Sequence, residues 1–203
     1  ELYYAQGDFP KSAELFAQLL SEHAGDQRTK SARHRAAWAA HNAGLYADAL
    51  KTAEASMKGA EGKVLTEWLY LKANCERQLS QNESAVASYD RLLSKKPSAK
   101  LAAASAYERA LTLYRMGRYE DAIKGARKVK STDANRKDIY WLLAEAYAAA
   151  KDVDHAVQYY RLITSEFADS DVAADAFYRL AYHLQQGKKL TEAARYYRQL
   201  AER

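Results

Sequence analysis

Hydrophobic positions recur at helical spacing along the chain. In the segment that starts at Tyr140, further anchors follow after 3, 4, 7, 16, 20 and 23 positions, and the segment that starts at Phe177 repeats these offsets. Offsets of 3, 4 and 7 place residues on one face of a helix, and the later group, spaced 4 and then 3, forms one face of a second helix. A short polar turn separates the groups. Each segment is therefore predicted to be a helical hairpin.

The hairpin pattern repeats along the chain. The small residue that follows each predicted turn recurs at intervals of 37, 36, 37, 34 and 37 residues, at Ser12, Ala49, Ala85, Ala122, Ala156 and Ala193. A near-constant period in the thirties indicates stacked helical hairpins. Small residues such as Ala144, facing Ala156, and Ala181, facing Ala193, allow the two helix axes of a hairpin to approach closely.

Composition favours helices over strands. The 203 residues include many alanines, eight glycines and two prolines. Alanine gives up no side-chain entropy in a helix, whereas Gly and Pro break helices, so we predict an all-α fold. Pro10 fits the first turn of a helix and Pro97 the end of one. Ser98, Asp133 and Ser170 are predicted N-caps.

These anchors resemble the motif of the tetratricopeptide repeat (TPR) family: an aromatic, Leu, a small residue and an aromatic, then a Gly-containing turn, an aromatic, Ala and a bulky residue. Beside the two segments above, the stretch with Gly117, Tyr119 and Ala122 matches well. The resemblance covers essentially the whole chain and implies an α-α superhelix, a right-handed solenoid of about five and a half hairpins. We expect a single solenoid over residues 1–203, with approximate repeats at 1–26, 27–62, 63–97, 98–132, 133–169 and 170–203. Because its end repeats are incomplete, we also expect it to be a fragment of a longer protein.

The third hairpin departs most from the motif. Lys72 stands at the Leu position, Glu76 stands at an aromatic position, and the turn has no Gly. In the second hairpin, Arg33 replaces the first aromatic. We expect the third hairpin to form but to pack less tightly than the others.

Motifs that carry catalysis or metal binding are missing from the pattern. The glycines are scattered singly, so there is no phosphate-binding loop. His34 and His41 share a helix face but are separated by a rise of about 10.5 Å, too far for one metal ion, and the other histidines have no ligand spacing. Cys75 is interpreted as a buried small hydrophobe. We predict no enzyme activity, no metal and no cofactor.

The TPR resemblance implies that the first helices of the hairpins line a concave groove. Aromatic residues fill many groove positions, either packing between neighbouring hairpins or forming a docking surface, and Tyr, Trp and Arg are enriched at interface hot spots. We favour the docking surface. Its candidate partner-binding residues are Trp38, Tyr70, Asn74, Tyr107, Leu111, Tyr114, Arg115, Trp141, Glu145, Tyr178, Arg179 and Tyr182.

The partner expected from this surface is a protein or a peptide. The carboxylate clamp of chaperone-binding TPR proteins is absent, because only Asn74 fits it and acidic Glu108 and Asp138 stand where bases are needed. The net charge of +5 and pI near 9.1 leave a single-stranded nucleic-acid-binding repeat as an alternative. Glu145 and Asp175 place negative charge where phosphates would lie, which disfavours it. A third reading is the regulatory or scaffold arm of an enzyme whose catalytic domain lies elsewhere.

The cellular setting is inferred from a second resemblance. The last two repeats look like those of bacterial envelope proteins, including outer-membrane assembly lipoproteins, which share a Ser-x-x-Ala-x-x-Ala link, here Ser170, Ala173 and Ala176. The usual Tyr-Pro before the link is Phe167-Ala168 in this chain. No apolar run approaches the ~20 residues needed to span a bilayer. We expect a periplasmic or outer-membrane-associated scaffold rather than a cytoplasmic one, and homo-oligomers are compatible with the pattern.

Overall fold

The computed structural model describes residues 2–23, 26 and 29–203, and within these ranges it contains helices and turns but no strand. The helices are α1 (Leu2–Ala5), α2 (Phe9–Glu22), α3 (Thr29–Asn42), α4 (Tyr46–Ser56), α5 (Gly62–Gln78), α6 (Asn82–Ser94), α7 (Ala99–Arg115), α8 (Tyr119–Ala126), α9 (Arg136–Ala149), α10 (Val153–Glu166), α11 (Ala173–Gln186) and α12 (Leu190–Ala201). The all-α prediction is confirmed. The chain divides into two compact units, unit 1 (Glu1–Ser105) and unit 2 (Ala106–Arg203), and the boundary falls within α7.

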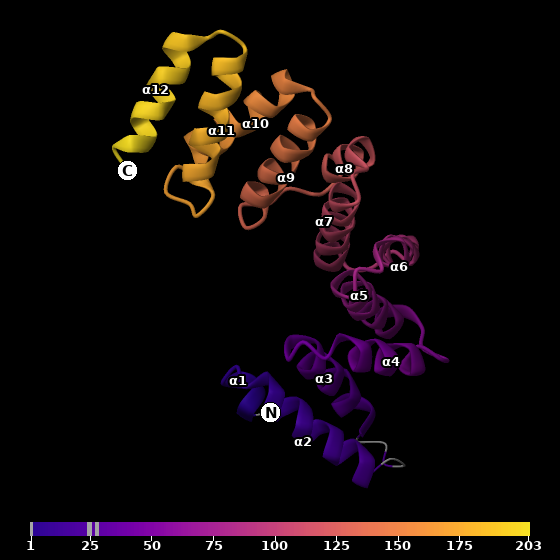
Figure 1. The fold of residues 1–203 in the computed structure, drawn as a ribbon. Coiled ribbons are helices and arrows are strands. Elements are labelled where there is room, and N and C mark those ends of the chain that lie inside the picture. The colour runs from indigo at the N-terminus through magenta and orange to yellow at the C-terminus, as the bar shows by residue number, and fades with distance from the viewer. Residues whose placement is uncertain (1, 24–25, 27–28) are drawn as a thin grey trace. The chain divides into compact units, whose positions relative to one another are not determined.

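In unit 1 each helix from α2 to α5 packs against the next one in the sequence (Figure 1). One core cluster lies among α3, α4 and α5 and consists mostly of small or flat side chains: Ala37, Ala49, Ala53, Trp68, Leu71 and Cys75. A second cluster joins Ala13 and Phe16 of α2 to Ala39 of α3. The buried alanines let the helix axes approach closely, as the spacing of small residues predicts.

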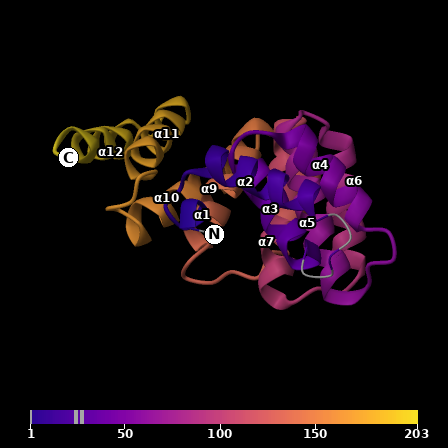
Figure 2. The same ribbon diagram turned by 90° about the horizontal axis from the view of Figure 1, so that it is seen from below.

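In unit 2 the helices from α8 to α12 also pack in sequence order, and Figure 2 shows α11 and α12 side by side. Ala144 and Ala156 are fully buried between α9 and α10, and Ala181 and Ala193 are buried between α11 and α12. A Cβ added at Gly125 of α8 would lie only 3.3 Å from the Cβ of Ala110 in α7. The small anchors of the repeat are therefore contact points between helices.

All six hairpin turns share one backbone conformation. Each contains a residue with positive φ, and the next residue donates its N–H to the carbonyl five residues earlier, the bond of a Schellman motif. The positive-φ residues follow the repeat intervals and are Gly7, Gly44, Ser80, Gly117, Lys151 and Lys188. Ser80 adopts φ +60°, so the third hairpin turns in the same way without Gly.

The third hairpin is well buried despite its departures from the motif. Leu69, Leu71 and Ala73 of α5 are fully buried, so the expectation of looser packing is wrong. The two departures pair with each other, because Lys72 Nζ lies 2.8 Å from Glu76 Oε1 and also 2.5 Å from Glu54 Oε1 of α4. An ion pair thus replaces two apolar anchors.

Two of the three predicted N-caps are wrong. The Ser98 Oγ accepts from the Leu101 N–H at 3.4 Å, in agreement with the prediction. Helix α9, however, begins after Asn135, and α11 begins after Val172. The Asn135 side chain accepts from the Thr132 N–H at 2.7 Å, so a local turn competes with the cap at the predicted place.

Candidate functional site

In unit 1 the predicted groove residues Trp38 and Tyr70 lie together. Their ring centroids are 6.1 Å apart, joining α3 to α5. Two histidines of α3 complete a histidine–tryptophan cluster: His34 meets Trp68 edge-on at 4.9 Å, and His41 meets Trp38 at 5.3 Å. The rings pack against one another, so part of this predicted surface is used to join neighbouring helices.

The environment of the two histidines of this cluster favours the neutral imidazole. Their Nε2 atoms are buried and have no hydrogen-bond partner among the described residues. Burial lowers the pKa of His34 and of His41, because a charged imidazolium would lose its hydration.

Asn74 lies beneath this surface. It has only 6% of its surface exposed. Its side-chain Nδ2 donates to the Tyr70 carbonyl at 2.8 Å, and its Oδ1 accepts from the Tyr89 hydroxyl at 3.2 Å. Any effect of Asn74 on a partner is therefore indirect, through the position of Tyr70.

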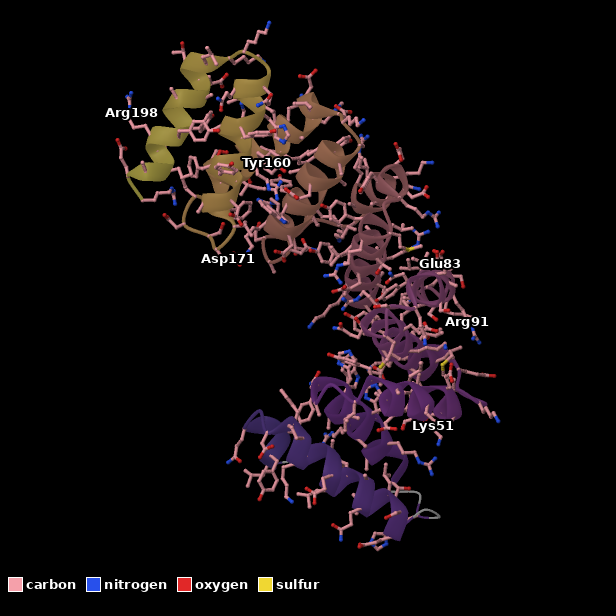
Figure 3. All side chains as sticks on the ribbon, in the orientation of Figure 1. Lys51, Glu83, Arg91, Tyr160, Asp171 and Arg198 are labelled. Carbon is pink, nitrogen blue, oxygen red and sulfur yellow. The ribbon has the colours of Figure 1, made fainter. Side chains whose placement is uncertain are left out.

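Glu145 occupies the equivalent position in unit 2. Its Oε1 accepts from the buried Tyr160 hydroxyl at 2.5 Å, its Oε2 accepts from the Tyr114 hydroxyl at 3.5 Å, and Arg179 Nε lies 3.0 Å from Oε1. Burial, together with the hydrogen bond to Glu145, raises the pKa of Tyr160. Figure 3 labels Tyr160, whose ring meets Trp141 of α9 at 6.1 Å and His183 of α11 at 5.9 Å.

This network orients Arg179. The guanidinium lies 6.0 Å from the Trp141 ring centroid and is held at Nε by Glu145. The side chain is 47% exposed, although its Nε lies 3.0 Å from Glu145 Oε1. Arg179 is thus fixed on its inner side and available on its outer side.

Five of the nine predicted residues in unit 2 line a hollow of about 380 Å³. We call it the tyrosine hollow; its lining residues are Tyr114, Glu145, Ala148, Ala149, Tyr178, Arg179, Tyr182 and His183. Tyr178 and Tyr182 are 53% and 44% exposed, and two small residues, Ala148 and Ala149, also line the hollow. Five predicted site residues therefore line one surface, with Trp141 packed against Arg179.

The remaining predicted residues lie outside the tyrosine hollow. Tyr107 is half-buried, and burial, with a smaller effect of Asp138, raises its pKa to about 12. Leu111 is half-buried and Arg115 is exposed. Tyr107 and Leu111 therefore have less surface for a partner than Tyr178 and Tyr182 have.

The sequence did not predict that His183 lines the tyrosine hollow, or that Glu145 binds Tyr160, Tyr114 and Arg179. Two hairpins carried a signal: a polar residue of the first helix stands fifteen residues before a Tyr of the second, Asn74 before Tyr89 and Glu145 before Tyr160. In the last hairpin the residue at this position is Tyr182, before Tyr197. Where the second helix has Ala at this position, as with Ala53, the first-helix residue fifteen positions earlier is apolar, here Trp38.

The described residues bear on three questions: metal binding, thiol reactivity and membrane spanning. They contain no group of three or more His, Cys, Asp or Glu side chains that could hold a metal ion. Cys75 is fully buried, as predicted, and burial raises its pKa to about 12, so it stays a protonated thiol. In the same part of the chain no helix is long and apolar enough to cross a membrane.

The tandem hairpins with matching turns define an α-helical repeat protein. Sequence models of the tetratricopeptide repeat match residues 1–61, 70–135 and 107–171, and a second one matches residues 175–203. The chain belongs to the tetratricopeptide repeat family. Among curated proteins the comparison finds no match.

Solved structures show the same fold at low sequence identity. MamA residues 41-end from Desulfovibrio magneticus RS-1 is 14% identical, with a TM-score of 0.71 over 94% of each chain. The C-terminal part of a TPR repeat-containing protein from Cytophaga hutchinsonii is 14% identical, with a TM-score of 0.78 over 99% of this chain and 76% of that one. YrrB, described as a TPR protein with an unusual peptide-binding site, is 14% identical, with a TM-score of 0.70 over 94% and 92%.

Proposed function

We propose that the protein is a non-catalytic scaffold that binds a protein or peptide segment on aromatic surfaces of its first helices. The tyrosine hollow carries this proposal. It combines two exposed tyrosines with an arginine whose orientation is fixed by Glu145. Rigid aromatic side chains and a pre-oriented arginine lose little conformational entropy on binding, which makes them effective interface residues. The peptide-binding site named for YrrB, a protein of the same fold, adds support by analogy.

The bound segment is expected to place an apolar side chain in the tyrosine hollow beside its two alanines. Ala148 and Ala149 line the same hollow as the exposed Tyr178 and Tyr182, so a side chain that enters it would contact small and aromatic side chains. A polar group of the segment would reach the Nη groups of Arg179. This arrangement follows the usual anatomy of interfaces, an apolar centre with a polar edge.

The test begins with a peptide selected from a random library against the immobilised chain. We expect the double variant Tyr178→Ala/Tyr182→Ala to weaken binding on the order of 10-fold or more, since hot-spot tyrosines each contribute above about 1 kcal/mol. Both side chains are exposed, so the helical circular dichroism signal should not change. The matched control is Tyr3→Ala, which removes a tyrosine that is 39% exposed in unit 1. Equal losses in the control and the double variant would refute the proposal.

A setting in the bacterial cell envelope is a separate part of the proposal. Its support is the sequence resemblance around Ser170. Ala173 and Ala176 of that link are buried at the start of α11, so the link serves packing whatever the compartment. Fractionation of cells that express the full-length protein tests the setting, and recovery with the cytoplasmic fraction would contradict it.

A further inference from the structure

A different hollow lies in unit 1, where α5 and α7 begin and α6 ends. Its volume is about 520 Å³. Four lysines line it, Lys63 of α5, Lys95 and Lys96 after α6, and Lys100 of α7, and the ring of Tyr70 and the side chain of Leu101 contribute apolar surface. We call it the lysine hollow.

The positive charge of this hollow is largely uncompensated. Glu67 is the one acidic residue among its lining residues, all of which the structure describes, and Lys63 Nζ lies 3.7 Å from its carboxylate. Lys95, Lys96 and Lys100 have no acidic partner within 4.0 Å in the described ranges. The lining therefore carries four positive charges and one negative charge, a net +3. Like charges this close repel one another, which is a cost to the folded protein.

Local helix stability does not explain all four lysines. Lys95 and Lys96 follow the end of α6, where positive charge is favourable beside the helix dipole. Lys63 and Lys100 instead stand in the first turns of α5 and α7, where positive charge is unfavourable, and neither first turn contains an acidic residue. Lys63 is offset in part by its i,i+4 pair with Glu67, whereas the charge of Lys100 opposes the stability of α7.

The backbone at the end of α6 helps to form the hollow. Lys96 adopts φ +50°, in the left-handed region that favours glycine, and Pro97 prevents the helix from continuing. The chain turns sharply there and enters α7 at Ala99. Lys95 and Lys96 are thereby brought to the same hollow as Lys63, which lies more than thirty residues earlier in the sequence.

We propose that the lysine hollow docks an acidic segment of the partner protein. Aspartate or glutamate side chains of the segment pair with Lys95, Lys96 and Lys100, and an apolar side chain lies against Tyr70 and Leu101. The inference rests on the proposed function, binding of a protein segment, and adds the chemistry of that segment. The lysine hollow lies in unit 1 and the tyrosine hollow in unit 2, so separate variants test the two hollows.

A peptide fits this hollow better than a nucleic acid does. Glu67 forms part of the wall and would repel a phosphate backbone. Proteins that bind single strands stack successive bases on aromatic rings, but Tyr70 is the one aromatic side chain in the lining, and its ring already packs at 6.1 Å from Trp38 and 6.4 Å from Tyr89. Carboxylates on a flexible segment can reach the lysines without stacking.

The experiment measures binding of two short fluorescent peptides with blocked ends to the whole chain. One peptide alternates Glu with Leu and Phe, and the other has Gln in place of every Glu. We expect the Glu peptide to bind more tightly, and we expect Lys96→Glu/Lys100→Glu to weaken it on the order of 10-fold, because each exposed pairing is replaced by repulsion. The control Lys51→Glu/Lys189→Glu makes the same change in net charge at exposed lysines that do not line the hollow.

Each alternative outcome overturns the proposal in a recognisable way. Equal binding of the Glu and Gln peptides would show that carboxylates are not recognised. Equal losses in the control and the hollow variant would indicate a response to net charge alone. Tighter binding of a short oligothymidylate, lost in Lys96→Glu/Lys100→Glu, would assign the hollow to nucleic acid. If the lysine variant has no effect while Tyr178→Ala/Tyr182→Ala still weakens a selected peptide, the proposed function stands and this inference fails.

Discussion

The ion pair of Lys72 with Glu76 predicts an asymmetric set of stability changes. The side chains of Lys72 and Glu76 are 18% and 5% exposed, and Glu76 Oε2 is buried with no hydrogen-bond partner among the described residues. Lys72→Leu places the motif residue at position 72 but leaves the Glu76 carboxylate buried without its cation. Removing one partner of a buried pair costs about 3–5 kcal/mol. Because Lys72 keeps some contact with solvent, we expect about 3 kcal/mol.

The double variant should reverse this loss. Lys72→Leu/Glu76→Leu removes both charges and supplies apolar side chains where the repeat motif has them, so its stability should return to within about 1 kcal/mol of the original or exceed it. Glu76→Leu alone should cost less than Lys72→Leu, because Lys72 retains Glu54, which is 54% exposed and keeps the pair partly solvated.

Urea unfolding followed by circular dichroism at the helix band measures all three variants. The reasoning is refuted if Lys72→Leu is neutral, or if the double variant is as unstable as Lys72→Leu. The second result would mean that lost packing, and not the uncompensated charge, causes the destabilisation. The double-mutant cycle separates these terms because the two residues are in direct contact.

Two further predictions concern stability. Replacing Ser80 or Lys151 with Gly should raise the free energy of unfolding by about 0.5–1 kcal/mol, because both have positive φ; denaturant midpoints lower than those of the original chain would contradict this. Burial lowers the pKa of His34 and His41, so below about pH 6.5 the unfolded chain takes up protons that the folded chain does not. Stability present at pH 7.5 should therefore fall as the pH drops through 6.5. Urea midpoints measured across this range should flatten when both residues are changed to Gln, and an unchanged slope would count against the buried-histidine explanation.

The hairpins could be predicted because their signals are local or strictly periodic. Ala156 and Ala193 recur in register with the other small anchors, and burial of each agrees with the prediction. The turns were recognisable wherever Gly was present. Ser80 and Lys151 show why composition alone is insufficient, since the Schellman hydrogen bonds hold a non-glycine residue in the left-handed conformation.

The candidate site was predictable only in part, because its geometry depends on pairs from different helices. Periodicity places Glu145 and Arg179 on first helices but does not show that one orients the other. It also cannot distinguish half-buried Tyr107 from exposed Tyr178. The lysine hollow was not predicted, because its charges come from the ends of three helices and follow no period.

The boundaries of the repeats and the assignment of the whole chain to one solenoid stay predictions, as does homo-oligomer formation. Within each unit, the sequential packing of helices follows the order that the repeat implies. The absence of a cofactor also stays a prediction. The family assignment supports binding as the basic activity.

The most direct test of the account is to locate a bound peptide on the protein. A selected peptide that carries a photoreactive benzophenone is cross-linked to the chain, and the adducts are mapped by mass spectrometry. We predict adducts on α9 and α11 at the tyrosine hollow, chiefly on Tyr178 and Tyr182. Adducts confined to the second helices α8, α10 and α12 would contradict the claim that the aromatic surface of the first helices binds the partner.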